Sequence, residues 1–285
     1  MDSETVVING EIFKFVKRSR RGEVAVYTSG ELYARVGEKS VIENMLALHQ
    51  KFDGFGFPVA KIMGVGENDP AAYFLEESFG DKCFSFLFKD DFEKQGRVSE
   101  ELFEKLISVA EKFARAQLRS AISEQVGDSF AKLVGPNDLH EELPEFSEKI
   151  STRYHEAVST LKVFPSVLTH GDFNPHNLFP GGVIDFEETY YGPAGYDLVT
   201  NIFSNSYFPE TPGYGWIRLY SLTPEQKNLY YTRLDKVYTE AGLPKISEYR
   251  EHFEFLRAIW LVRGNHQAPK LQAWRYDLFK KAYFQ

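Results

Sequence analysis

VLTHGDFNPHNLFPGGVIDFEETYYGPAGYDL, residues 167–198, includes two aspartates that follow short apolar runs, with an asparagine between them. Asp172 follows the apolar start of the stretch, Asp185 follows a second apolar run, and Asn177 lies between them. Polar side chains placed in this way are typical of strand ends, where a sheet delivers side chains into a site. We therefore expect these three residues to meet in one functional site.

Transfer of a phosphoryl group from a nucleotide needs the groups that this stretch offers. One carboxylate accepts the proton of the acceptor hydroxyl, and an amide with a second carboxylate holds Mg²⁺. The spacing H-x-D-x-x-x-x-N, formed by His170, Asp172 and Asn177, matches the catalytic loop of protein kinases. The segment Ile184–Glu187 (IDFE) takes the place of their metal-binding D-F-G. We therefore expect Asp172 to be the catalytic base, and Asn177 and Asp185 to bind Mg²⁺.

At these residues the chain resembles the aminoglycoside phosphotransferase/choline kinase family, whose hallmarks are an HGD-x-x-x-x-N loop and an ID-[WF]-E strand. The resemblance implies a two-lobed, protein-kinase-like α+β fold, with a small antiparallel-sheet N-lobe and a larger, mainly helical C-lobe. It also implies that ATP or GTP donates its γ-phosphoryl group to a hydroxyl of a small molecule. The acceptors implied are amine-bearing: an aminoglycoside, an amino sugar or a choline-like alcohol.

Other interpretations of the central stretch stay open. Its Asp and Asn side chains could simply cap turns, although turn chemistry does not require the second acidic cluster. His170, Asp172, His176 and Asp185 could form the metal centre of a hydrolase, but this leaves Asn177 idle and names no nucleophile. A nucleotide-binding pseudokinase without turnover is the third alternative, and the complete set of three site residues argues against it.

The composition favours a globular protein with an aromatic core. The 285 residues are 43% hydrophobic and include 25 Phe and 16 Tyr. The net charge of −8 argues against a nucleic-acid partner and suits a cationic small substrate. The single cysteine, Cys83, excludes an internal disulfide and fits a reducing compartment. The start MDSETVV does not resemble a signal peptide, and the apolar runs are too short to span a membrane, so we expect a cytoplasmic protein.

Residues 6–36 have the alternation and turn signals of a three-stranded meander. Its strands are expected at residues 11–16, 24–27 and 32–36. The first turn, Ser19–Gly22, occupies the place of a kinase loop that covers phosphates. Its N–H groups, with Arg20 and Arg21, could contact phosphates, but an ordinary hairpin turn explains the same residues.

Arg35, on the third strand, stands where a protein kinase places its phosphate-binding lysine. It resembles the variant found in the choline-kinase branch, and its fork suits bidentate phosphate contact. The alternative is an arginine on the solvent face of an edge strand. A helix follows, with its buried stripe at Val41, Met45, Leu48 and Phe52. Glu43, which lies off that stripe, is the expected ion-pair partner of Arg35 and Glu38 the second candidate; a solvated Glu43 is the alternative.

The apolar segment 73–80 ends in acidic and small residues and resembles the hinge between kinase lobes. The resemblance implies that backbone groups from Glu76 to Ser78 contact the adenine. We therefore place a boundary at residue 78, between a nucleotide-binding lobe of residues 1–78 and a catalytic and substrate-binding lobe of residues 79–285.

The second lobe is expected to be mainly helical. Helices are expected at residues 99–120, before Leu161, at 223–242 with a capping box, from Ser247, and at 271–283. Tyr207, Trp216 and Tyr220 could pack in the core or line the substrate cleft.

Four further residues of this lobe have weaker assignments. We expect His170 to brace the catalytic loop by hydrogen bonding. Asp197 resembles the family aspartate that supports this loop from behind. Gln117 occupies a position where the family often has a histidine, and we assign no function to Gln117. Glu187 and Glu188 could bind an amine at the mouth of the site, or could be solvated.

Overall fold

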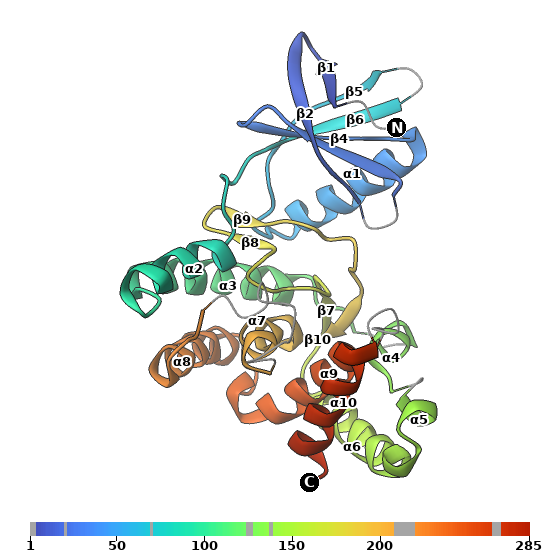
Figure 1. Ribbon diagram of the computed structural model, residues 1–285, viewed down its shortest axis with the longest axis vertical. Helices are drawn as coiled ribbons and strands as arrows, with labels where there is room; N and C mark the ends of the chain where they lie inside the picture. The colour runs from blue at the N-terminus through green and yellow to red at the C-terminus, as the bar shows by residue number, and fades with distance from the viewer. Residues whose placement is uncertain are drawn as a thin grey trace.

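The protein has a two-lobed α+β fold, as predicted (Figure 1). The computed structural model describes residues 4–19, 22–68, 71–123, 128–136, 139–207, 220–263 and 269–285. Arg20, Arg21, Trp216 and the side chain of Tyr207 lie outside the described part. A sheet with one helix forms the N-terminal lobe, at the top of Figure 1, and helices dominate the lobe below it.

An antiparallel sheet forms the N-terminal lobe, with the strand order β1-β2-β3-β4-β6-β5. Its strands are β1 (Thr5–Ile8), β2 (Glu11–Arg18), β3 (Val24–Thr28), β4 (Leu32–Gly37), β5 (Ile62–Asn68) and β6 (Ala71–Glu77). The predicted meander is confirmed, because β2, β3 and β4 pair in sequence. The structure adds β1, which joins β2 through Asn9 and Gly10, both with positive φ. Such Asn-Gly turns match the twist of the flanking strands.

The two faces of this sheet bury different clusters. Along β4, Ala34 points into a core on the inside of the curled sheet, whereas Arg35 points to the opposite face. Helix α1 (Lys39–Gly54) covers that second face, and its Ile42 belongs to one buried cluster with Phe74 of the sheet. Alternation along each strand thus sends one set of side chains to the sheet core and the other toward α1. The predicted stripe of α1 is buried fully only at Phe52, because its other members border a cavity.

The second lobe packs its helices around an aromatic core. They are α2 (Phe84–Gln95), α3 (Glu100–Arg119), α4 (Asp128–Val134), α5 (Leu139–Glu142), α6 (Ser147–Thr160), α7 (Tyr196–Tyr207), α8 (Pro224–Glu240), α9 (Arg250–Val262) and α10 (Pro269–Tyr283). The predicted helices are found within a few residues. Helix α8 begins with the expected capping box of Thr223 and Gln226. Helix α9 begins only at Arg250, because residues 246–249 form a 3₁₀ turn. Tyr220 belongs to the buried core.

Two short ladders carry the central motif between the lobes. Strand β7 (Ser166–Leu168) pairs with β10 (Tyr191–Pro193), and β8 (Leu178–Phe179) pairs with β9 (Gly182–Val183). The β8–β9 hairpin lies at the junction with the upper lobe (Figure 1). No helix in the described ranges combines the length and apolarity needed to cross a membrane. The assignment of residues 1–78 and 79–285 as separate domains stays a prediction.

Candidate active site

Asp197 holds the start of the catalytic loop from behind. Its carboxylate accepts the amide N–H of His170 at 2.8 Å and that of Gly171 at 3.1 Å. Gln117 Nε2 donates to the same carboxylate at 2.7 Å. Gly171 has φ +84°, and a Cβ there would lie 2.2 Å from the carbonyl oxygen of Glu188, so only glycine fits. The supporting role expected of Asp197 is confirmed, and Gln117 gains a role that the sequence did not show.

His170 braces the loop through both ring nitrogens, as expected. Nε2 donates to the carbonyl of Ile184 at 2.8 Å, and Nδ1 accepts the amide N–H of Asp172 at 3.2 Å. The ring therefore joins the catalytic loop to the segment that carries Asp185. Neither nitrogen is left for a metal ion. In the described ranges no group of three or more His, Cys, Asp or Glu side chains is placed to hold a metal, so His170, Asp172, His176 and Asp185 do not form the expected alternative metal centre.

Asp172 is held by donors on both carboxylate oxygens. Arg257 Nη2 donates to Oδ1 at 3.1 Å, and Asn177 Nδ2 donates to Oδ2 at 3.2 Å. Its side chain stays 36% exposed, so an acceptor can approach it. Burial alone would raise the pKa of Asp172, but the charge of Arg257, the neighbouring His170 and two hydrogen bonds outweigh burial and lower it. The carboxylate is therefore ionised at neutral pH, as a base must be.

Arg257 is the main site residue that the sequence did not reveal. It lies in α9, is 1% exposed, and reaches the catalytic loop from far along the chain. The sequence marks this residue only as a single arginine within the mostly apolar segment FEFLRAIWLV, residues 253–262. Charged residues are rarely buried without a partner, so a buried ion pair could have been predicted at this position. Its partner could not have been named.

Asn177 and Asp185 flank the β8–β9 hairpin at its open end. The pair Leu178–Val183 closes the ladder, and the amide of Ile184 donates to the carbonyl of Asn177 at 3.0 Å. Because Asn177 uses its Nδ2 on Asp172, its amide oxygen remains as an acceptor. Asp185 adopts a φ of +70°, an uncommon conformation for a non-glycine residue. One amide oxygen and one carboxylate fit Mg²⁺, which binds few protein oxygens and completes its shell with phosphate and water.

Arg35 is held by Glu76 and not by Glu43, so the predicted partner was wrong. Arg35 Nε donates to Glu76 Oε1 at 2.9 Å, whereas Glu43 is exposed on α1. The Arg35 side chain is only 14% exposed, which contradicts a place on the solvent face. Burial would lower the pKa of Arg35, but the charges of Glu76 and Asp185 outweigh burial and raise it. The guanidinium therefore remains charged.

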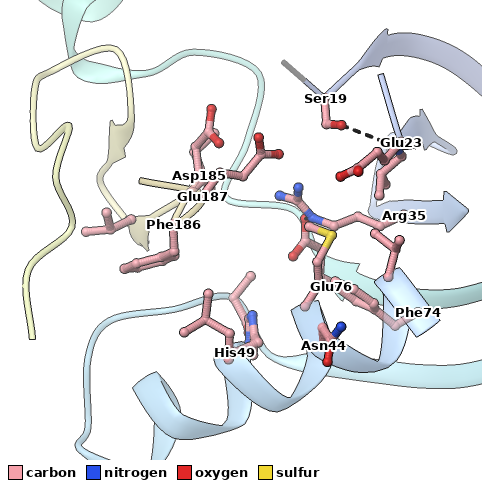
Figure 2. Close-up of a pocket in the computed structure, with 17 residues that line it drawn as sticks. Ser19, Glu23, Arg35, Asn44, His49, Phe74, Glu76, Asp185, Phe186 and Glu187 are labelled. Carbon is pink, nitrogen blue, oxygen red and sulfur yellow. Dashed lines mark hydrogen bonds and ion pairs between the residues drawn. The ribbon is translucent and has the colours of Figure 1, made fainter. Parts of the chain in front are cut away.

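A cavity of about 360 Å³ lies between α1, the sheet and residues 183–187. Figure 2 shows Arg35 reaching into it from one wall while Asp185 and Glu187 face it from another. From α1, Asn44 and His49 border the same space, so the helix offers it no carboxylate. The cavity thus brings the phosphate-binding candidate and one metal-binding candidate to one space.

The turn at Ser19 behaves as a hairpin. Ser19 N donates to the Val24 carbonyl at 2.8 Å, and Gly22 N donates to the Ser19 carbonyl at 2.9 Å. Both amide N–H groups are therefore engaged within the turn and are not free for phosphates. From the neighbouring strand, Lys17 Nζ lies 3.7 Å from Asp185 Oδ2.

Two amides expected to meet the adenine are already engaged. Glu77 N donates to the Lys61 carbonyl and Ser78 N donates to the Glu31 carbonyl, each at 2.9 Å. The Ser78 hydroxyl accepts from Gly80 N at 3.1 Å. An adenine-binding role of the Ser78 N–H is therefore inconsistent with this geometry. The Glu76 side chain pairs with Arg35, and a contact of the Glu76 backbone with the adenine stays a prediction.

The sequence matches the phosphotransferase enzyme family (APH) over residues 20–230. A comparison with curated proteins gave no match. Among solved structures, the fold is similar to the aminoglycoside phosphotransferase APH(2'')-IIa in complex with gentamicin. That pair has 14% sequence identity and a TM-score of 0.57, and the likeness covers 94% of this chain and 90% of that one.

Two further solved structures share the fold. One is a choline/ethanolamine kinase family protein from Mesorhizobium loti, with 14% identity, a TM-score of 0.56 and coverage of 94% of this chain and 86% of that one. The other is APH(3'')-Id from Streptomyces rimosus in complex with ADP and streptomycin, with 12% identity, a TM-score of 0.52 and coverage of 86% and 92%. These likenesses confirm the predicted fold, and the family match covers the catalytic loop, both proposed metal ligands and Arg35. The chain belongs to the phosphotransferase enzyme family and is a small-molecule kinase.

Proposed function

We propose that the protein transfers the γ-phosphoryl group of ATP or GTP to a hydroxyl of a small, amine-bearing molecule. The observation that carries the proposal is the arrangement of two carboxylates, an amide and a guanidinium in the catalytic segment and the adjoining cavity. Asp172 lies beside Asn177, the β8–β9 hairpin connects Asn177 to the segment that carries Asp185, and Arg35 and Asp185 line one cavity. Phosphoryl transfer is mostly positioning and charge stabilisation, and these groups supply both.

Asp172 is the proposed base. Its carboxylate is ionised at neutral pH and partly exposed, so the acceptor hydroxyl can donate a hydrogen bond to it. This hydrogen bond orients the hydroxyl oxygen toward the γ-phosphorus. As the new oxygen–phosphorus bond forms, the carboxylate takes up the hydroxyl proton, the bond from the γ-phosphorus to the β–γ bridging oxygen breaks, and the nucleoside diphosphate leaves. Because the loop is fixed by Asp197 and His170, the carboxylate need not reorganise during the reaction.

Mg²⁺ would be held by the amide oxygen of Asn177 and by the carboxylate of Asp185. A bound ion there would supply positive charge that offsets the charge developing on the transferred phosphoryl group. Arg35 is the proposed phosphate ligand. Its Nε is used on Glu76, and in the described part of the chain its two Nη groups have no hydrogen-bond partner. They can bind phosphate oxygens in a fork.

An amine-bearing acceptor is supported by the charge of the protein and by its relatives in fold. The net charge of −8 favours a cationic ligand. Two solved structures with this fold contain gentamicin and streptomycin. We propose an amine-bearing acceptor for this chain as well. Glu187 and Glu188 are the proposed carboxylates for an ammonium group, and Glu187 already borders the cavity.

A nucleotide-consumption screen tests this function. Wild-type protein with Mg²⁺ and either ATP or GTP is given a panel of amine-bearing sugars and alcohols, with the Asp172→Asn protein as the matched blank. We expect at least one acceptor to stimulate consumption in the wild type only, with a phosphorylated product found by mass spectrometry. Tight nucleotide binding without a product across the panel would instead favour a non-catalytic binding protein.

A further inference from the structure

Arg257 is among the largest side chains that the described fold buries completely, and it carries a charge. A guanidinium taken out of water loses its hydration, so the fold must supply partners at that position. Arg257 lies in α9, where its neighbours Leu256 and Ala258 are fully buried apolar residues. An aliphatic side chain would be the ordinary choice in this helix.

The partners of Arg257 are two consecutive residues of the catalytic loop. Nη1 donates to the carbonyl of Gly171 at 3.2 Å, and Nη2 donates to Asp172 Oδ1 at 3.1 Å. The guanidinium lies over the ring of Trp260, 3.7 Å from its centroid, which favours a cation in this plane. One head group thus fixes the loop backbone and the Asp172 side chain together. Since Asn177 holds Oδ2, both carboxylate oxygens have a set direction.

Stability alone does not account for this pair. Arg257 Nε is buried and has no hydrogen-bond partner in the described part of the chain. Asp172 is 36% exposed, so water could solvate it without a buried partner. A buried ion pair is often no more stable than well-packed apolar residues of similar volume. The placement therefore favours a role in orienting Asp172 over a role in holding the fold.

We propose that Arg257 is a positioning residue for phosphoryl transfer, which fixes the Asp172 carboxylate toward the acceptor hydroxyl without touching the substrate. The inference rests on the proposed function, because that function makes Asp172 the base. Misplacement of a reacting group by about 1 Å can cost roughly 10²-fold in rate. Loss of Arg257 therefore lowers kcat, while nucleotide binding at Arg35, in the N-terminal lobe, is kept.

Substitutions at position 257 test the proposal. Arg257→Met keeps an unbranched apolar stem and removes the head group. Arg257→Lys keeps the charge but loses the fork that serves two acceptors. Arg250→Met is the matched control, because Arg250 lies on the same helix and pairs with Glu254 near the surface. We expect kcat at least about tenfold lower in Arg257→Met, an intermediate kcat in Arg257→Lys, and nucleotide KM within about threefold throughout. The control should match the wild type.

A double-substitution cycle separates orientation from general damage. If Arg257 acts through Asp172, then loss of Arg257 should have little further effect on kcat in a protein that already carries Asp172→Asn. The double variant should then turn over within about threefold of Asp172→Asn alone. Losses that multiply, or a folded Arg257→Met with wild-type kcat, would overturn the proposal.

A second readout needs no acceptor. The side-chain amide of Asn177 donates to Asp172 Oδ2, so its NMR resonances report how that carboxylate is held. We expect them to shift or broaden in Arg257→Met, to return in part in Arg257→Lys, and to stay in place in Arg250→Met. Unchanged resonances in both position-257 variants would overturn the proposal. If Arg257→Met does not fold, Arg257→Lys carries the comparison. If the wild type phosphorylates no acceptor, the proposed function is wrong, whereas the NMR comparison still tests whether Arg257 orients Asp172.

Discussion

Arg35 and Glu76 form an ion pair between neighbouring strands, with Nε 2.9 Å from Oε1. Strands β4 and β6 pair so that Arg35 lies opposite Phe74, which places Glu76 diagonally across the ladder. Diagonal neighbours on one face of an antiparallel pair are within reach of long side chains. The partner of Arg35 is therefore set by the sheet, and the position of α1 does not decide whether the guanidinium is held.

Glu76→Ala should weaken nucleotide binding by about 1 kcal/mol, the usual net value of one hydrogen bond. Without Glu76, the Arg35 side chain is free to turn toward Asp185 or Glu187, which already act on its pKa. Glu43→Ala is the matched control, since Glu43 is an exposed carboxylate on α1. Calorimetric titration with nucleotide measures both variants. An equal loss in both, or no loss in Glu76→Ala, would contradict the assignment of the partner.

Arg35→Ala should weaken nucleotide binding by about 1.5–3 kcal/mol, the range for hydrogen bonds to charged groups. Arg35→Lys should recover only part, because one ammonium cannot replace a bidentate fork. Comparing affinities for nucleoside triphosphate and for the free nucleoside locates the effect, since only the former carries phosphates. Unchanged triphosphate affinity in both variants would remove Arg35 from the phosphate site.

The sequence predicted the parts of the site that depend on local spacing. His170, Asp172 and Asn177 lie in one loop, and Asp185 follows a tight hairpin, so their order along the chain nearly fixes their geometry. Asp197 could be named because the family carries an aspartate at that place. The Asn9–Gly10 hairpin was also readable, as a known turn signal, but β1 was not predicted.

The partners that sequence reasoning missed are long-range. Glu76 lies 41 residues from Arg35 and Arg257 lies 85 from Asp172. The first pair depends on strand register, and register is set by which face each residue occupies in the folded sheet. The second depends on how α9 packs below the catalytic loop. Glu43 was expected as the partner because it lies on the helix that directly follows the strand of Arg35. The periodicity of that helix gives no information about β6, which comes later in the chain and carries Glu76.

Asp185→Ala should abolish turnover and reduce the effect of Mg²⁺ on nucleotide affinity. The Asp185 carboxylate is one of the two proposed protein ligands of the ion, with the Asn177 amide, and Mg²⁺ tolerates few substitutes in its shell. Titration with nucleotide in the presence of Mg²⁺ and of EDTA gives the metal dependence directly. Glu188→Ala serves as a control for the metal dependence of nucleotide affinity, because Glu188 is proposed to bind the acceptor and not the metal ion. Identical metal dependence in wild type and Asp185→Ala would exclude Asp185 from the metal site.

Asp172→Asn should lower kcat by at least about 10²-fold, the lower end of general-base contributions. The amide keeps the shape of the side chain but cannot take up the acceptor proton, so it is a cleaner change than alanine. Nucleotide affinity should stay within roughly threefold, about 0.6 kcal/mol, because the base acts mainly in the transition state. Steady-state kinetics on an acceptor from the screen, beside calorimetric titration of nucleotide, separates these two quantities.

Since Arg257 and Asn177 both donate to this carboxylate, the amide also loses one of its two acceptor oxygens, and a small loss of thermal stability is expected with the loss of kcat. If Asp172→Asn turns the acceptor over at the wild-type rate, Asp172 is not the base, and the role proposed for Arg257 falls with it.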